Sequence, residues 1–88
     1  MKFLLRSPDQ VLLERDHIIS FSATLLDERR ITILQNHAPV LAVVKAGEIQ
    51  LRDRKTEESL SIQQSILKFR KNQITLYCED AVSEEEMK

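Results

Sequence analysis

Residues 31–44 read I-T-I-L-Q-N-H-A-P-V-L-A-V-V, two apolar runs joined by one polar corner. The β-branched and aliphatic side chains favour strands, so we expect one strand to end at Leu34 and another to cover Val40–Val44. Pro39 cannot donate a hydrogen bond to a ladder, and Asn36 is one of the few non-glycine residues that tolerate a positive φ. The corner is therefore expected to be a turn of defined shape between two strands.

The rest of the chain repeats this pattern of short strands and turns. Residues 17–23 alternate in polarity with a period of two, and Gly47 lies where the chain is expected to reverse. Turn residues recur at Ser7–Gln10, Asp27–Arg30, Asp53–Glu58 and Lys71–Asn72. Such spacing predicts an all-β protein, a small antiparallel β-sandwich of about ten short strands. We expect its core to contain Phe3, Ile19, Phe21, Ile33, Ile49, Leu51, Ile62, Phe69, Ile74 and Leu76.

Length and charge limit what this chain can be. Its 88 residues form one domain, able to bury about two thirds of the surface of the unfolded chain. The net charge of −1 provides no field that would recruit nucleic acid or an acidic membrane. No apolar run approaches the roughly 20 residues that span a bilayer, and the N-terminus has no signal or transit pattern. We expect a soluble intracellular protein that neither binds nucleic acid nor inserts into a membrane.

The residues that usually carry chemistry are few and scattered. The two histidines, His17 and His37, lie in different elements, whereas a zinc site needs about four ligands. Cys78 shares its strand face with apolar residues, which favours core packing over nucleophilic catalysis. The chain has one glycine and hence no glycine-rich loop for a phosphate. We therefore predict no enzymatic activity, metal, cofactor or small-molecule substrate.

A basic cluster, Lys68, Arg70 and Lys71, lies beside Phe69. Such a cluster can attract phosphate or stack a base, but a solvated strand face is the preferred interpretation at this net charge. The acidic residues 83–86 are likewise interpreted as solvating. Because Asp80 is a good N-cap, we expect an acidic tail, residues 80–88, with one or two helical turns after a domain covering residues 1–79.

The corner Asn36-His37-Ala38-Pro39 resembles the Gly-His-Ala-Pro turn in the N-terminal β-sandwich domain of the epsilon subunit of F-type ATP synthases. Other segments match that domain in the same order: Ser7-Pro8-Asp9, Lys45–Ile49, Leu67–Phe69, Asn72–Leu76 and Asp80-Ala81. The resemblance covers nearly the whole chain. Arg30 stands where the family has an acidic side chain, and Gln63-Gln64 stands where it has paired glycines.

The resemblance implies a non-catalytic central-stalk subunit of the rotor, which docks on the gamma subunit and the membrane rotor ring and couples ion translocation to ATP synthesis. It implies a location on the inner, cytoplasmic face of the plasma membrane. The positions that match the gamma-facing surface are Ser7, Val40, Ala42 and Val44. The positions that match the ring-facing loops are Arg29, Arg30 and His37.

Strand Val40–Val44 is apolar on both sides, and from the resemblance we expect one side to pack internally and the other to meet gamma. On this hypothesis a charge at Ala42 abolishes gamma binding and leaves the fold intact. An alternative function is a small β-sandwich adaptor that binds a peptide along a sheet edge. A long, uncharged and exposed edge strand would favour the adaptor.

Overall fold

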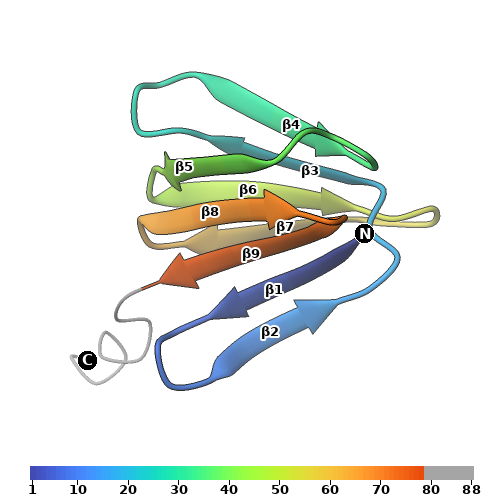
Figure 1. The fold of residues 1–88 in the computed structure, drawn as a ribbon, viewed down its shortest axis with the longest axis horizontal. Helices are drawn as coiled ribbons and strands as arrows, with labels where there is room; N and C mark the ends of the chain where they lie inside the picture. Colours follow the sequence, from blue (N-terminus) through green and yellow to red (C-terminus); the bar gives the residue numbers. More distant parts are fainter. Residues whose placement is uncertain (79–88) are drawn as a thin grey trace.

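The computed structural model describes residues 1–78, which fold into two packed β-sheets (Figure 1). The larger sheet has the strand order β2-β1-β9-β8-β5, with strands at Val11–Arg15, Lys2–Arg6, Gln73–Cys78, Ser65–Arg70 and Val40–Val44. The smaller sheet has the order β4-β3-β6-β7, with strands at Arg30–Leu34, Ser20–Thr24, Gly47–Arg52 and Glu57–Ile62. The predicted β-sandwich is confirmed, with nine strands in the described part of the chain. The predicted helical stub lies outside the described residues, and the boundary after residue 79 stays a prediction.

The turns form where the sequence supplies the required residues. Lys71 and Asn72 both have positive φ, at 51° and 58°, the geometry of a two-residue hairpin turn between β8 and β9. At the β6–β7 turn, Asp53 Oδ1 accepts hydrogen bonds from the backbone N–H groups of Lys55 and Thr56 at 2.8 and 2.7 Å. This tip is shorter than the predicted segment Asp53–Glu58, because residues 57 and 58 already pair with β6.

Within the described residues four links carry the chain between the sheets, and the two shortest, of two residues each, flank β6 and β7. Gly47 has φ 146° and follows directly on the link from β5 in the larger sheet to β6 in the smaller one. A side chain would be strained at this φ, so glycine is required by the backbone rather than by space. The reversal predicted here joins two sheets instead of two paired strands. Gln63 and Gln64 make the return link from β7 to β8.

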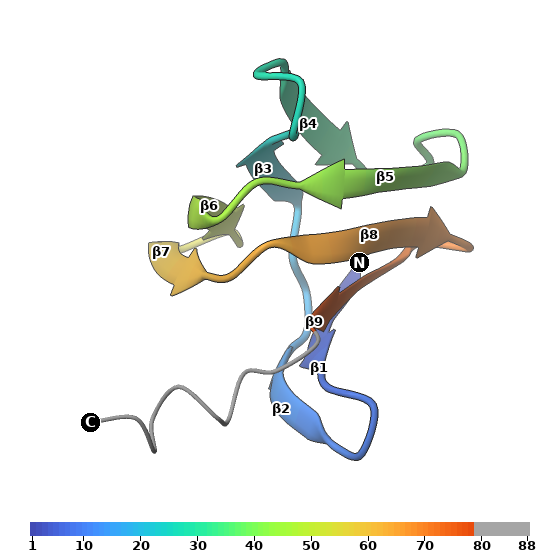
Figure 2. The same cartoon turned by 90° about the vertical axis from the view of Figure 1, so that its left-hand side faces the viewer.

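The core lies between the two sheets, which Figure 2 shows from the side. Its rings include Phe3 and Phe21, stacked with centroids 6.0 Å apart. Of the ten residues predicted for the core, those that are buried are Phe3, Phe21, Ile33, Ile49, Leu51, Phe69, Ile74 and Leu76.

Ile19 and Ile62 are not buried as predicted. Ile18 takes the core position instead of Ile19, because β3 begins only at Ser20 and His17 turns the chain at φ 61°. The alternation therefore does not extend back through residue 19. Ile62 is half-buried because it ends β7, an edge strand.

Both open sides of the sandwich are closed by contacts between the sheets. On one side, Arg15 of β2 makes a two-point ion pair with Glu58 of β7, at 3.0 and 3.1 Å. On the other side, Leu25 forms an isolated β-bridge with Val44, and the Leu26 N–H donates to the Val43 carbonyl at 2.9 Å. The edge strand β5 is thus tied to the end of β3.

Candidate partner-binding surface

Strand β5 presents the apolar side chain of Leu41 to solvent. The sequence predicts a partner contact through other residues of this strand. Leu41 is 76% exposed and Val43 half-buried, whereas Val44 is 0% exposed. Val40 and Ala42 are half-buried and pack against the core. Val40, Ala42 and Val44 thus lie on the core-facing side of β5, and their predicted contact with gamma stays a prediction that this geometry does not favour. Their ladder neighbours on β8, such as Phe69 and Leu67, point inward, and residues paired across a ladder share a face.

The exposed side of β5 belongs to a longer apolar strip. Val43 pairs with Ile66 on β8, and Ile66 pairs with Tyr77 on β9, so the three side chains form one row on the outer face of the larger sheet. Ile66 and Tyr77 are exposed, as is Leu41, one pleat away along β5. We call Leu41, Val43, Ile66 and Tyr77 the apolar band.

Two grooves include residues of the apolar band. One, of about 430 Å³, is lined by Pro8, Ile66 and Tyr77 among others. The second, of about 230 Å³, lies between Val43 and the β3–β4 turn and includes the exposed Leu26. An exposed apolar surface of this kind, with hollows that can accept side chains, is typical of a protein–protein contact.

Ser7, the other residue predicted to contact gamma, is only 7% exposed. Its backbone N–H donates to the Gln10 carbonyl at 2.9 Å, and its hydroxyl oxygen accepts from the Gln10 N–H at 3.3 Å. Ser7 therefore shapes the β1–β2 turn, and the surface there is formed by its exposed neighbours Pro8 and Asp9.

The β3–β4 turn holds Arg29 and Arg30 in different ways. Arg29 donates through Nε to Asp27 Oδ2 at 2.8 Å, and a hydrogen bond from the Arg29 backbone, followed by that from its side chain, lowers the pKa of Asp27 below its usual value. Arg30 donates to Thr24 and Gln50, at 3.1 and 2.7 Å, across the outer face of the smaller sheet. Both guanidinium groups stay exposed.

His37 lies at the other end of β4, in the corner that the sequence singled out. The corner has the predicted positive φ, 66° at Asn36, and is held by Asn72: the Asn36 N–H donates to Asn72 Oδ1 at 2.8 Å, and Asn72 Nδ2 donates to Asn36 Oδ1 at 3.2 Å. The His37 ring makes an edge contact with the Phe69 ring, with the two ring centroids 6.1 Å apart. Sequence reasoning did not identify Asn72 as the residue that fixes this corner.

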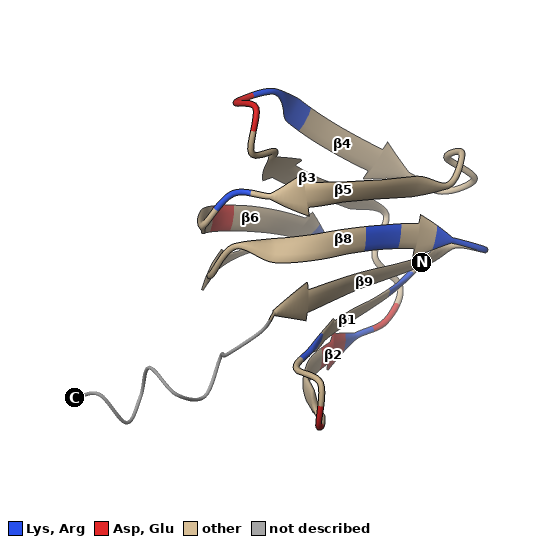
Figure 3. Ribbon diagram, turned by 60° about the vertical axis from the view of Figure 1, so that its left-hand side comes forward, with Lys and Arg blue, Asp and Glu red and all other residues tan. Residues whose placement is uncertain are grey.

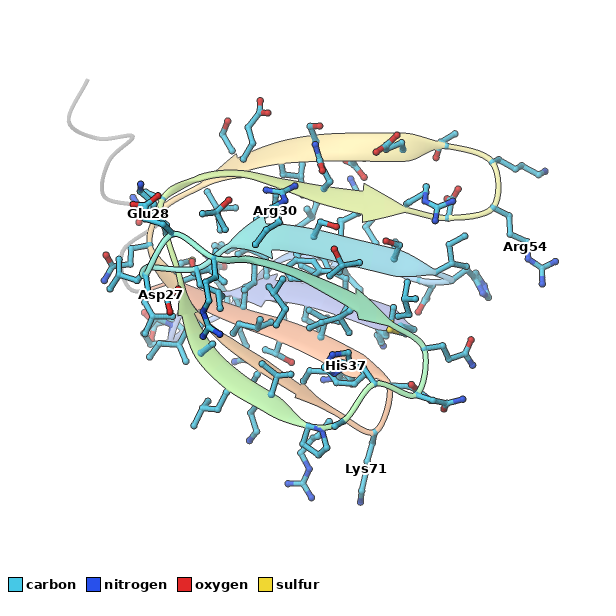
Figure 4. All side chains as sticks on the ribbon, turned by 90° about the horizontal axis from the view of Figure 1, so that it is seen from above. Asp27, Glu28, Arg30, His37, Arg54 and Lys71 are labelled. Atoms are coloured by element: carbon cyan, nitrogen blue, oxygen red, sulfur yellow. The ribbon has the colours of Figure 1, made fainter. Side chains whose placement is uncertain are left out.

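The structure does not bring the three predicted ring-facing residues together. Arg30 and His37 lie at opposite ends of β4 (Figure 4), which at five residues is about 15 Å long. Arg29 and Arg30 share a corner with Glu28, whose carboxylate pairs with Lys45 at 2.6 Å. A single small contact cannot involve both this corner and His37.

A basic row lies on the outer face of the larger sheet, beside the apolar band. Lys68 and Arg70 of β8 and Lys71 of the turn line a groove of about 250 Å³ that also includes Thr75 and Tyr77. Figure 3 shows these positions in blue on β8 and the following turn. Phe69 is only 1% exposed and points the other way, so it cannot stack a base as one interpretation of the sequence required.

The residues that usually carry chemistry do not gather in the described part of the chain into a cluster that could bind a metal. Residues 1–78 hold no group of three or more His, Cys, Asp or Glu side chains that could ligate a metal. Cys78 is buried and its Sγ donates to the Arg6 carbonyl at 3.4 Å. Within the same residues, no helix is long and apolar enough to cross a membrane. The exposed features of the described surface are the apolar band, the basic row, the corner at Arg29 and Arg30, and the corner at His37.

Comparison with known proteins gives a family and a fold. Residues 2–84 match the family model described as ATP synthase, Delta/Epsilon chain, beta-sandwich domain. A chain in the cryo-EM structure of the central stalk and c-ring of Tetrahymena thermophila mitochondrial ATP synthase superposes with a TM-score of 0.69 at 15% sequence identity. The superposition covers 90% of the present chain and 63% of that chain. Comparison with curated proteins gave no match. At this identity the superposition establishes the fold.

Proposed function

Because the chain belongs to the family of ATP synthase delta/epsilon-chain β-sandwich domains, we propose that it is a non-catalytic subunit of the central stalk of a rotary ATP synthase. In this role it docks on the gamma subunit and on the membrane rotor ring, and it couples ion translocation to ATP synthesis. It is membrane-associated through that complex, on the cytoplasmic face of the plasma membrane. It needs no cofactor of its own.

The observation that carries the proposal is the apolar band. Leu41 is the most exposed of the large apolar side chains among residues 1–78, and it lies on an edge strand beside three further apolar residues. A domain this small gains nothing for its own stability from an exposed leucine. Burial against a partner is the process in which this side chain contributes free energy, so we place the gamma contact on Leu41 and Val43.

We place the rotor-ring contact at the β3–β4 turn. The side chain of Arg29 is 75% exposed, and Arg30 follows it as the exposed first residue of β4. His37, in the corner beyond the other end of β4, serves a second contact, with the Asn36–Asn72 pair fixing its position. Contacts at both ends of β4 would resist rotation of the domain relative to its partners, as a torque-bearing part requires.

The adaptor alternative is not favoured by the backbone of β5. This strand is uncharged and lies at an edge, but its open side is partly used, since Val43 already accepts a hydrogen bond from the Leu26 N–H. The Lys45 N–H also donates to the Thr24 carbonyl at 2.8 Å, just beyond the strand. A peptide adding along this edge would find only part of the ladder available.

The test is reconstitution of a membrane-bound ATP synthase that lacks its epsilon subunit. Adding this protein should restore proton pumping driven by ATP, without lowering the rate of ATP hydrolysis by the catalytic head. Leu41→Asp should fail to restore pumping, whereas Leu34→Asp, at a leucine that is 52% exposed on the smaller sheet, should restore it. Pumping that is not restored by the unmodified protein, in a complex from its own source, would refute the proposed function.

A further inference from the structure

The basic row has positive charge that the described chain does not neutralise. Among residues 1–78, Lys68, Arg70 and Lys71 make no ion pair, whereas the four ion pairs in that range join other cations to carboxylates at 2.6–3.0 Å. The groove that they line contains no acidic side chain. Three adjacent cations above a polar floor form a site for an anionic segment of chain.

The sequence contains such a segment immediately after the strand that forms the groove floor. Residues 79–88 read E-D-A-V-S-E-E-E-M-K, with five acidic residues and one lysine, and they follow Cys78, the last residue of β9. We propose that this acidic segment, residues 79–88, is the ligand of the basic row. Bound there, it covers the β8 side of the outer face.

The lengths agree with this pairing. Lys68 pairs with Thr75 and Arg70 with Gln73, three and five residues before the end of β9, hence about 10 and 17 Å from Cys78. Residues 84–86 come six to eight residues after Cys78, and a chain of that length can span at most about 20–29 Å, which is enough to reach both positions. Tethering at this distance gives an effective concentration on the order of millimolar.

The contact is reversible because all three cations are exposed. Salt weakens exposed pairs, since the screening length falls from about 10 Å at 0.1 M to about 3 Å at 1 M ionic strength. The groove shares Tyr77 with the apolar band, so the bound segment competes with any partner that approaches β8. Only this last consequence rests on the proposed docking of gamma; binding of the segment to the basic row does not.

A spin label on the acidic segment tests the proposal without any partner. A nitroxide is attached at Ser83→Cys, while the buried Cys78 stays unlabelled, as mass spectrometry can verify. The backbone amides of Lys68 and Leu4 provide the comparison, because they flank Thr75 on β8 and β1 respectively. We expect the line broadening at Lys68 to exceed that at Leu4 several-fold at about 20 mM salt, and the two to become equal at about 1 M salt.

Two triple variants complete the test. The first replaces the basic row by glutamine, and the matched control replaces three exposed cations near the β6–β7 turn: Arg52→Gln, Arg54→Gln and Lys55→Gln. We expect the preference for the β8 side to disappear in the first variant and to persist in the control. Equal broadening on the two sides of β9 in the unmodified chain, or a preference that survives loss of the basic row, would overturn the proposal.

Discussion

Truncating Leu41 separates binding from stability more cleanly than any other change in the apolar band. Full burial of a leucine side chain is worth about 1.5–3 kcal/mol. Because Leu41 is 76% exposed, the part still available for burial by a partner corresponds to about 1–2 kcal/mol. Leu41→Ala should therefore weaken binding to gamma about 5- to 30-fold. Leu41→Asp should weaken binding to gamma further, because the interface would remove the carboxylate from water without supplying a compensating charge or hydrogen bond.

The assay is calorimetric titration of an epsilon-free catalytic head, which contains gamma, with each variant. Chemical denaturation of the isolated variants provides the control, and there Leu41→Ala should change the free energy of unfolding by less than about 0.5 kcal/mol. Leu34→Ala, which truncates an exposed leucine on the smaller sheet, should leave the affinity unchanged. An affinity for Leu41→Ala within twofold of the unmodified protein would remove the apolar band from the docking surface.

Ala42 provides the converse case. Since Ala42 packs against the core, Ala42→Asp should lower the free energy of unfolding by about 2 kcal/mol, and any loss of binding should follow from that loss of stability. This replaces the expectation that a charge at Ala42 would leave the fold intact. Equal stability of Ala42→Asp and the unmodified protein would show that the side chain is not held against the core.

Further predictions concern the core, the β6–β7 turn and the corner. Phe69→Ala and Ile74→Ala should each cost about 2–5 kcal/mol in chemical denaturation, and a cost under about 0.5 kcal/mol for both would contradict the core assignment. Hydrogen bonds from the turn backbone lower the pKa of Asp53, so its ionised form stabilises the fold above the unfolded pKa of about 4, and this contribution is lost as the pH falls through the lower folded value. Asp53→Asn should accordingly flatten the dependence of stability on pH below about 4, as measured by denaturation across that range. Asn72→Ala removes the acceptor of the Asn36 N–H, so hydrogen exchange of that amide should accelerate about 2- to 12-fold; unchanged exchange would mean that Asn72 does not hold the corner.

The sequence predicted strand β5 correctly but did not show which of its sides faces the core, for a physical reason. The segment Val40–Val44 has no polar residue, so nothing in it marks the side that faces water. That side is decided by β8, where Lys68 and Arg70 face out and Leu67 and Phe69 face in. The ladder between β5 and β8 joins residues more than twenty positions apart. The alternation of side chains within one strand therefore cannot predict which strand it pairs with, nor which of its sides faces the core.

The corner shows the same division between local and distant causes. A positive φ at Asn36 could be predicted, because asparagine is one of the few non-glycine residues that tolerate it. Its partner Asn72 could not, since the two turns meet only when the sheets pack. Ile18 was missed for a local reason that does leave a signal: a residue in the left-handed region, His17, interrupts the alternation before β3 begins.

The pairing of β1 with β9 has a consequence for how the domain folds. These are the first and last strands of the described chain, they pair in parallel, and β9 lies between β1 and β8. A nascent chain therefore lacks the middle of its larger sheet until residue 78 has been made. Until then β1 and β8 have unpaired edges, and the core lacks the buried side chains of Ile74 and Leu76. We expect this domain to acquire its structure late in synthesis and in one step, with a folding rate limited by the search that brings its two ends together.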